Sequence, residues 1–313
     1  MKKISFVLPI YNEEQNIPEL YKRLIKVTKQ IVDKYKVEFV AINDGSIDKS
    51  LDELLKIHYK DERLIVVNFS RNFGQQAAIT AGLDIASGDA VIIMDADLQD
   101  PPELSLDLIK KWEEGFDVVY AQRRTRKDNI FKKITAYIFY RLLDSIAEIK
   151  IPKDTGDFRL IDRRVVEALK NYKEKNRYIR GLVSLVGFKQ TCILFDRQER
   201  FSGTTHYNFK KMIKLATDAV VNFSNFPIQL ISKIGLVLFF LSILWLPVMM
   251  YIDLYPQNTV LSNVLEAIVL LITLIGSIIL ISLGIIGIYV IRIHSEVLAR
   301  PIYIISSIYK KND

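Results

Sequence analysis

The stretch VIIMDADLQDPPEL, Val91–Leu104, decides the fold class because an apolar run passes directly into acidic residues. Val91 to Met94 has the character of a buried strand, and Asp95 and Asp97 follow it with one alanine between them. Residues two apart in an extended chain point the same way, so we expect both carboxylates to face one target. A buried strand that ends in acid is typical of an open α/β sheet, whose ligands bind outside the carboxyl ends of the strands.

The sequence around this stretch predicts a Rossmann-like, mostly parallel sheet covered by helices. Up to about residue 117, short apolar runs alternate with longer amphipathic segments. Strands are predicted at Ile4–Ile10, Val37–Ile42, Leu64–Phe69, Ala90–Met94 and Val118–Ala121. Pro18 suits the first turn of the first helix, Ser46 is expected to cap the second helix, and Gly88 is expected to end the third.

Polar side chains follow four of these predicted strands. They are Pro9, Tyr11, Asn12 and Glu13; Asn43, Asp44, Gly45 and Ser46; Ser70, Arg71 and Asn72; and Asp95, Asp97 and Gln99. Because the carboxyl ends of parallel strands meet at one edge of a sheet, we expect these residues to line one crevice.

The paired acids indicate a cation site. Two bare carboxylates repel each other unless a cation or a proton relieves them. With no cysteine or histidine nearby, the expected cation is Mg²⁺ or Mn²⁺, which commonly takes one or two carboxylates and completes its shell with substrate phosphates. The alternative is an Asp-x-Asp that caps a turn made by Pro101 and Pro102. Tyr11, Glu13 and Asp44 on neighbouring strand ends favour the cation site.

Chain length, net charge and cysteine content limit the classes of binding partner. The chain has 313 residues and a net charge of +7, which favours anionic partners. The basic residues cluster beside apolar segments, so nucleic acid is not an expected partner. A single cysteine, Cys192, excludes an intramolecular disulfide and is interpreted as a core residue.

Two apolar segments near the C-terminus predict two transmembrane helices. Ile234–Ile252 and Leu265–Ile291 each approach or exceed the roughly 20 residues that span a bilayer. Buried core helices would need a second large domain to cover them. Lysines and arginines flank both segments but are absent from the connection, so we expect an inner-membrane, multi-pass protein with a cytoplasmic catalytic domain and C-terminus.

These features predict four regions. Residues 1–208 form the catalytic domain, 209–228 amphipathic juxtamembrane helices, 229–293 the two-helix transmembrane domain, and 294–313 a cytoplasmic tail. The juxtamembrane segment suits an interfacial helix and a helix packed on the domain equally well. Gly276, Gly284 and Gly287 suit helix contacts in a homo-oligomer or a lipid-facing surface.

The motifs resemble a known family. VLPIYNEEQNI, INDGSID, DADLQDPPE, DTGDFRLIDRR and RFSGTTHY, followed by two apolar segments, resemble the family 2 glycosyltransferases that load a sugar onto a polyprenyl phosphate, such as bactoprenol glucosyltransferases and dolichol-phosphate mannose synthases. The resemblance covers nearly the whole chain, with the motifs in the same order. It implies a GT-A fold, a nucleotide-sugar donor and a divalent metal.

The resemblance also implies roles for individual residues. Metal binding falls to Asp95 and Asp97, and the catalytic set is Asp97, Asp157, Arg123 and Arg200. The nucleotide-sugar contacts are Pro9, Tyr11, Glu13, Ile42, Asp44, Asp95, Ala96, Gln99, Arg123, Arg200 and His206. His206 stands where the family usually has a lysine, and Asn43 replaces the first aspartate of the commoner DDGS form.

The sequence is less specific about the residues that bind the acceptor. Lys132 and Lys133 are candidates for the acceptor phosphate, although a solvated charged loop explains them nearly as well. Asp157 is expected to orient the acceptor or to act as a base, whereas Asp154 and Arg159 equally suit fold-stabilising partners.

The expected function is the metal-dependent, inverting transfer of a hexose from a nucleotide sugar to polyprenyl (undecaprenyl) phosphate at the cytoplasmic membrane face. The expected hexose is glucose, donated by UDP-glucose, and the lipid-linked product would supply cell-envelope glycan modification. The alternatives are a mannosyltransferase that uses GDP-mannose, and a non-catalytic membrane scaffold. A processive polysaccharide synthase would carry a Gln-x-x-Arg-Trp segment, which neither Trp112 nor Trp245 belongs to.

Overall fold

The computed structural model describes residues 1–124, 155–175, 177–196 and 260–311, together with the helical positions Lys233, Val237 and Phe240. The chain divides into two compact units, one of residues 1–219 with 301–313 and one of residues 220–300. The first unit holds the sheet, and the second holds helix α10, Val260–Val297.

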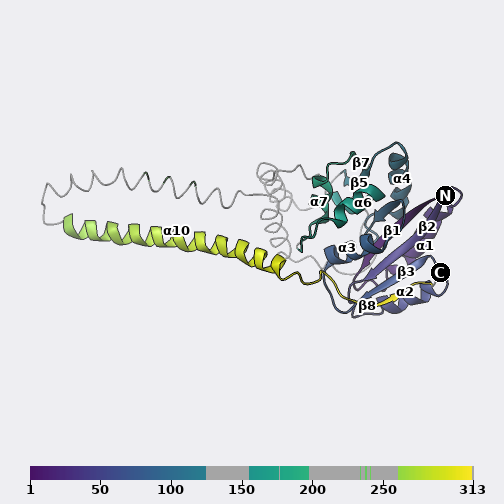
Figure 1. Ribbon diagram of the computed structural model, residues 1–313, viewed down its shortest axis with the longest axis horizontal. Coiled ribbons are helices and arrows are strands. Elements are labelled where there is room, and N and C mark those ends of the chain that lie inside the picture. Colours follow the sequence, from purple (N-terminus) through teal and green to yellow (C-terminus); the bar gives the residue numbers. More distant parts are fainter. Residues whose placement is uncertain are drawn as a thin grey trace. The chain divides into compact units, whose positions relative to one another are not determined.

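The described part of the first unit is built on an eight-stranded sheet in the order β7-β5-β6-β4-β1-β2-β3-β8 (Figure 1). The strands are β1 Lys2–Ile10, β2 Tyr35–Asn43, β3 Leu64–Phe69, β4 Ala90–Ile93, β5 Val118–Arg123, β6 Thr155–Asp162, β7 Gln190–Phe195 and β8 Ile305–Tyr309. Strands β1 to β4 are mutually parallel, as are β5 and β7. Strand β6 is antiparallel to both β4 and β5, and β8 is antiparallel to β3. The sheet is therefore mixed but mostly parallel.

Helices cover both faces of this sheet, because alternate strand residues feed two separate apolar cores. The helices are α1 Ile17–Lys29, α2 Ser50–His58, α3 Gln75–Ile85, α4 Ser105–Glu113, α6 Arg163–Lys170 and α7 Ile179–Leu185, with a 3₁₀ turn, η1, at Pro102–Leu104. One core joins Phe6 and Phe39 to α1 and α4, and the other joins Val7 and Val40 to α3, α6 and α7. A sheet buried on both faces leaves its edges and strand ends as the places for polar chemistry.

The five strands predicted from the sequence are all present, within two residues at each end. Two local predictions are wrong. Ser46 does not cap α2, whose N-cap is Lys49; its hydroxyl accepts instead from the Asn12 amide at 3.0 Å. Helix α3 ends at Ile85 with Ala86 as its C-cap, so Gly88 lies in the following turn. A Cβ on Gly88 would lie 2.5 Å from Ser5 Oγ, which explains the glycine by close approach.

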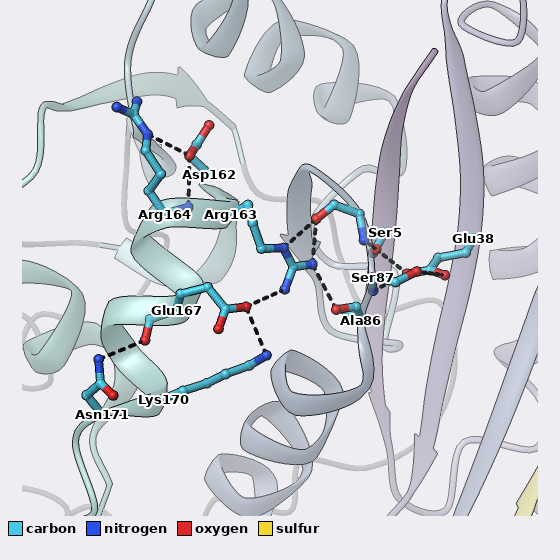
Figure 2. Close-up of polar contacts among 11 residues, drawn as sticks. Ser5, Glu38, Ala86, Ser87, Asp162, Arg163, Arg164, Glu167, Lys170 and Asn171 are labelled. Atoms are coloured by element: carbon cyan, nitrogen blue, oxygen red, sulfur yellow. Dashed lines mark hydrogen bonds and ion pairs between the residues drawn. The ribbon is translucent and has the colours of Figure 1, made fainter.

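Glu38 anchors a polar cluster near the amino ends of β1, β2 and β4 (Figure 2). Its carboxylate accepts from the hydroxyl of Ser5, and from the amide and hydroxyl of Ser87 at 2.6 and 2.7 Å. From the start of α6, the Arg163 guanidinium donates to the carbonyls of Ala86 and Gly88. These bonds tie the turn between α3 and β4 to two neighbouring strands and to α6.

Strand β8 extends the sheet beyond β3 and was not predicted. Val66 pairs with Tyr309, and the Ser70 amide donates to the Ile304 carbonyl at 3.0 Å. The ring of Tyr303 stacks on Phe69 with 5.2 Å between centroids. Residues 301–311 therefore belong to the compact unit that holds the sheet, and they support the end of β3.

The expectation of membrane-spanning helices requires a correction. Helix α10 contains the second apolar segment, whereas Ile234–Ile252 lies almost entirely outside the described residues. Within the part of the chain that the structure describes, no helix is both long enough and apolar enough to cross a membrane. This finding contradicts the predicted multi-pass inner-membrane location.

Candidate active site

The candidate site begins where the loops after β1 and β2 bind each other. The Asn12 side chain accepts from the Ile47 amide at 2.9 Å, and the Glu13 amide donates to Ser50 Oγ at 2.8 Å. The Lys49 amide donates to the Glu14 carboxylate at 2.9 Å. Asn12 itself adopts a left-handed backbone, with φ of 55°. The YNEE and GSID motifs thus form one rigid wall.

Asp44 joins this wall to the loop after β3. Its buried carboxylate accepts from the amides of Phe73 and Gly74 at 2.7 and 2.9 Å, and from the Asn72 side chain at 2.9 Å. Burial raises the pKa of Asp44, and these hydrogen bonds only partly oppose that effect. Asp44 therefore holds the loop after β3 in place.

Gly45 permits the two loops to approach so closely. It has φ of +63°, and a Cβ there would lie 2.3 Å from the Arg71 carbonyl carbon. Any other residue would push apart the loops after β2 and β3. The glycine of the GSID motif is thus explained by packing.

The Asp-x-Asp segment is a turn and not an extension of β4. Strand β4 ends at Ile93, and Leu98, although buried, has a left-handed φ of 59°. Strained non-glycine backbone of this kind concentrates at functional sites. One Asp97 oxygen accepts from the Gln99 amide at 3.1 Å. Asp95 and Asp97 therefore do not lie on an extended strand as expected, although the charge of Asp97 still acts on Asp95.

Asp157, near the start of β6, faces the same edge and is tied to Asp95. Arg180 of α7 donates through Nε to Asp157 Oδ1 at 2.6 Å, and through Nη1 to the Thr155 carbonyl at 3.1 Å. The Gln75 side-chain amide, at the first position of α3, donates to Asp95 Oδ1 at 2.8 Å and to Asp157 Oδ2 at 3.1 Å. Gln75 therefore bridges the two carboxylates.

The acids at this edge perturb one another strongly. Burial, together with the charges of Asp157, Asp97 and Asp100, raises the pKa of Asp95 to about 8. Burial also acts on Asp157, but the charge and hydrogen bond of Arg180 outweigh it, so the pKa of Asp157 is lowered. The charge of Arg180 also acts on Asp95, but it compensates the neighbouring acids only in part.

Arginines gather on the other side of these acids. Arg123, at the end of β5, lies 3.9 Å from Asp100, and a Cβ on Gly156 would touch both side chains. Burial lowers the pKa of Arg159 to about 10, which leaves it cationic at neutral pH, and it donates to the Gly156 carbonyl at 2.9 Å. The DTGDFR motif therefore packs directly against the DADLQD motif.

The remaining predicted residues fall into two groups. Pro9, Tyr11, Glu13 and Gln99 lie at or beside the ends of β1 and β4, partly exposed, whereas Ile42 and Ala96 are buried and pack within the two cores. The Ile42 side chain is therefore part of a core and does not face a ligand site. Lys132, Lys133, Asp154, Arg200 and His206 lie outside the described residues.

The acidic side chains suit a metal ion for which the protein supplies only some of the ligands. Among the described residues, no group of three or more histidine, cysteine or acidic side chains is arranged to hold a metal ion. Asp95 and Asp97 offer two carboxylates in a locally negative environment that raises the pKa of Asp95. Mg²⁺ and Mn²⁺ accept such a site when substrate phosphates complete the shell.

Gln75, Arg180 and Asp100 were missed from the sequence. Gln75 begins an ordinary helical segment, and Arg180 lies in the short amphipathic run YIRGLV. Only Asp100 carried a signal, as the third acid of DADLQD. The other two are placed by tertiary contacts between α3, α7 and β6.

Known proteins resemble this chain over nearly its full length. It is 46% identical to the uncharacterized glycosyltransferase YkcC of Bacillus subtilis, with 97% of this chain and 94% of that protein covered. It is 39% identical to the bactoprenol glucosyl transferase of Shigella phage SfII, with 99% of each covered. A solved structure, mannosyltransferase PcManGT from Pyrobaculum calidifontis in complex with GDP-Man and Mn²⁺, is 17% identical with a TM-score of 0.47, and the match covers 66% of this chain and 59% of that one.

The family model for glycosyl transferase family 2 matches residues 5–170. That range includes Asp44, Asp95, Asp97 and Asp157, whereas Arg180 of α7 lies outside it. The mixed, mostly parallel sheet with its acids beyond β4 is the Rossmann-like GT-A arrangement. The chain belongs to glycosyl transferase family 2 and is a glycosyltransferase.

Proposed function

We propose that this glycosyltransferase transfers a hexose from a nucleotide sugar to polyprenyl phosphate with inversion, and that its preferred donor is UDP-glucose. The name of the phage relative, a bactoprenol glucosyl transferase aligned over 99% of the chain, supports the lipid acceptor and the sugar. The observation that carries the chemistry is the cluster of Asp95, Asp97 and Asp157 beside buried arginines at the carboxyl edge of the sheet.

The donor would lie across the ends of β1, β2 and β4. Tyr11, Glu13 and the backbone around Ile42 offer the nucleoside a rigid wall, because hydrogen bonds fix the loops after β1 and β2 to each other. Asp95 and Asp97 would hold Mg²⁺ or Mn²⁺, which supplies positive charge to the leaving diphosphate. Arg123 lies on the same side and would bind the phosphates, as would Arg200.

The acceptor needs little activation. A phosphate oxygen is already anionic, so it can attack the anomeric carbon once it is held in line with the leaving group. Asp157 is a poor base here, since Arg180 holds its carboxylate at 2.6 Å and lowers its pKa. We therefore propose that Asp157 orients neighbouring groups, while Lys132, Lys133 and the cationic form of His206 serve the phosphates.

The test is a transfer assay with purified protein, undecaprenyl phosphate, and a panel of UDP- and GDP-sugars with Mg²⁺, Mn²⁺ or a chelator. We expect a glucosyl phospholipid from UDP-glucose, no product with the chelator, and a loss of at least about 100-fold in Asp97→Asn, the scale of lost transition-state charge stabilisation. Product from GDP-mannose alone would replace the donor assignment. Full activity of a folded Asp97→Asn protein would refute the metal role.

A further inference from the structure

Gln75 is the one described side chain shown to donate to two of the site's carboxylates at once. Its amide nitrogen lies 2.8 Å from Asp95 Oδ1 and 3.1 Å from Asp157 Oδ2. A side-chain amide carries two N–H donors, so one nitrogen can serve both acids. The bridge sets the separation of the two carboxylates.

Hydrogen bonds made by the two residues before Gln75 fix its position. It is the first residue of α3, and Gly74 before it donates to Asp44 Oδ2 at 2.9 Å. The Phe73 amide donates to the other oxygen of Asp44 at 2.7 Å. The chain of contacts runs from the end of β2 through the loop after β3 to the acids beyond β4, all of it within one compact unit.

The two acids that Gln75 joins differ in their charge partners. Arg180 compensates Asp157, whereas Asp95 faces three other carboxylates. A neutral amide steadies Asp95 without cancelling its charge, and so leaves it able to attract a cation. Without the bridge, Asp95 would be free to turn away from Asp157 and from the position that a metal ion requires.

We propose that Gln75 is a positioning residue that aims the Asp95 carboxylate at the donor-bound metal ion. This inference rests on the proposed function, because it assumes that Asp95 is a metal ligand. Groups that hydrogen-bond to metal ligands orient them, and their loss typically lowers metal affinity by about 10- to 100-fold. Gln75 does not itself contact the metal or the sugar in this proposal.

The experiment measures Mn²⁺ binding without turnover, from the electron paramagnetic resonance signal of free Mn²⁺, on the full chain with and without UDP. Gln75→Leu removes both donors, and Gln75→Asn keeps the amide but shortens the arm so that it cannot span both acids. Both should bind Mn²⁺ at least about 10-fold more weakly than the wild type. In the transfer assay, excess Mn²⁺ should restore the kcat of Gln75→Leu.

The matched control is Gln76→Leu, at the next position of the same helix. The Gln76 amide oxygen accepts from the Ile179 amide at 2.9 Å. We expect Mn²⁺ binding within about twofold of the wild type for this variant, since its contact is to backbone and not to an acid. Thermal unfolding without metal, measured for all three variants, reports whether each is folded.

The outcomes separate this inference from the proposed function. Folded Gln75 variants that bind Mn²⁺ as tightly as the wild type, or no more weakly than Gln76→Leu, would overturn the positioning role alone. A wild-type protein that binds no Mn²⁺, with or without UDP, would remove the metal role of Asp95 and this inference with it. Weakened binding confined to Gln75→Leu and Gln75→Asn supports both.

Discussion

A polar cluster with a carboxylate lies at each end of the strands, Glu38 at the amino ends and Asp95 at the carboxyl ends, and the two have opposite electrostatics. At the amino ends of the strands, burial would raise the pKa of Glu38, but hydrogen bonds from Ser5 and Ser87 and the charge of Lys3 outweigh it, so its pKa is lowered. At the carboxyl ends, burial and neighbouring acids raise the pKa of Asp95 to about 8. Both carboxylates belong to the same fold and lie near the same strands.

The difference lies in what surrounds each carboxylate. Glu38 accepts two hydrogen bonds from Ser87 and one from Ser5, so its charge is satisfied by the protein itself (Figure 2). Asp95 receives one bond from Gln75 and faces Asp97, Asp100 and Asp157. The hydrogen bonds of Glu38 stabilise the fold, whereas the acidic surroundings of Asp95 suit the cation proposed above. Strongly perturbed carboxylates of this second kind are typical of functional sites.

The largest expected effect is a loss of stability, and it should differ between an arginine at the carboxyl ends of the strands and one at the amino ends. Arg180→Met leaves the buried Asp157 charge uncompensated and should lower the free energy of unfolding by about 3 kcal/mol. Arg163→Met at the opposite end removes bonds to neutral carbonyls and should cost about 1 to 2 kcal/mol. Urea titrations of both variants measure the difference. Equal losses of unfolding free energy would show that the two clusters do not differ in how much they depend on a compensating charge.

Glu38→Gln should produce the next largest effect. The amide cannot accept all the donors that the carboxylate accepts, so we expect a loss of about 2 kcal/mol in unfolding free energy. The transfer rate of the folded variant should match the wild type, because Glu38 lies at the amino ends of the strands. A variant that keeps its stability but loses activity would reverse the roles given to the two ends.

Asp95→Asn should act in the opposite direction on stability. Asn removes an acid whose raised pKa makes its burial unfavourable at neutral pH, so the free energy of unfolding of the metal-free protein should rise by about 1 kcal/mol, while transfer activity is lost. The comparison is made by thermal unfolding in the presence of a chelator. A lower melting temperature in Asp95→Asn would show that Asp95 contributes to the fold as Glu38 does.

The pH dependence of stability should give the smallest effect. The folded-state pKa of Glu38 lies below its unfolded value of about 4.3. Its contribution is therefore complete above that value and is lost as pH falls through the folded pKa. As the pH falls below about 5, the wild type should therefore lose stability more steeply than Glu38→Gln. Parallel curves for the two proteins would contradict the lowered pKa.

The sequence predicted the parallel part of the sheet and the acids of the site. Strands β1 to β5 are buried runs bounded by polar loops, so their pattern alone identifies them. The insertion of β6 between β4 and β5 depends on tertiary pairing that no local pattern records. Asp95 and Asp97 could be found because they follow an apolar run, whereas Asp157 was found from the family resemblance of the DTGDFR motif. Gln75 and Arg180 resemble ordinary helix residues, and only the fold brings them to the acids.

Strand β8 has a consequence for how the sheet is made. Val66 pairs with Tyr309, so the outer edge of β3 stays open during synthesis until a segment far along the chain has left the ribosome. An open strand edge is a template for pairing with other chains. In the cell, nascent chains stalled before residue 305 should therefore need a chaperone. C-terminal fusions that disturb residues 305–309 should reduce yield before they reduce catalysis.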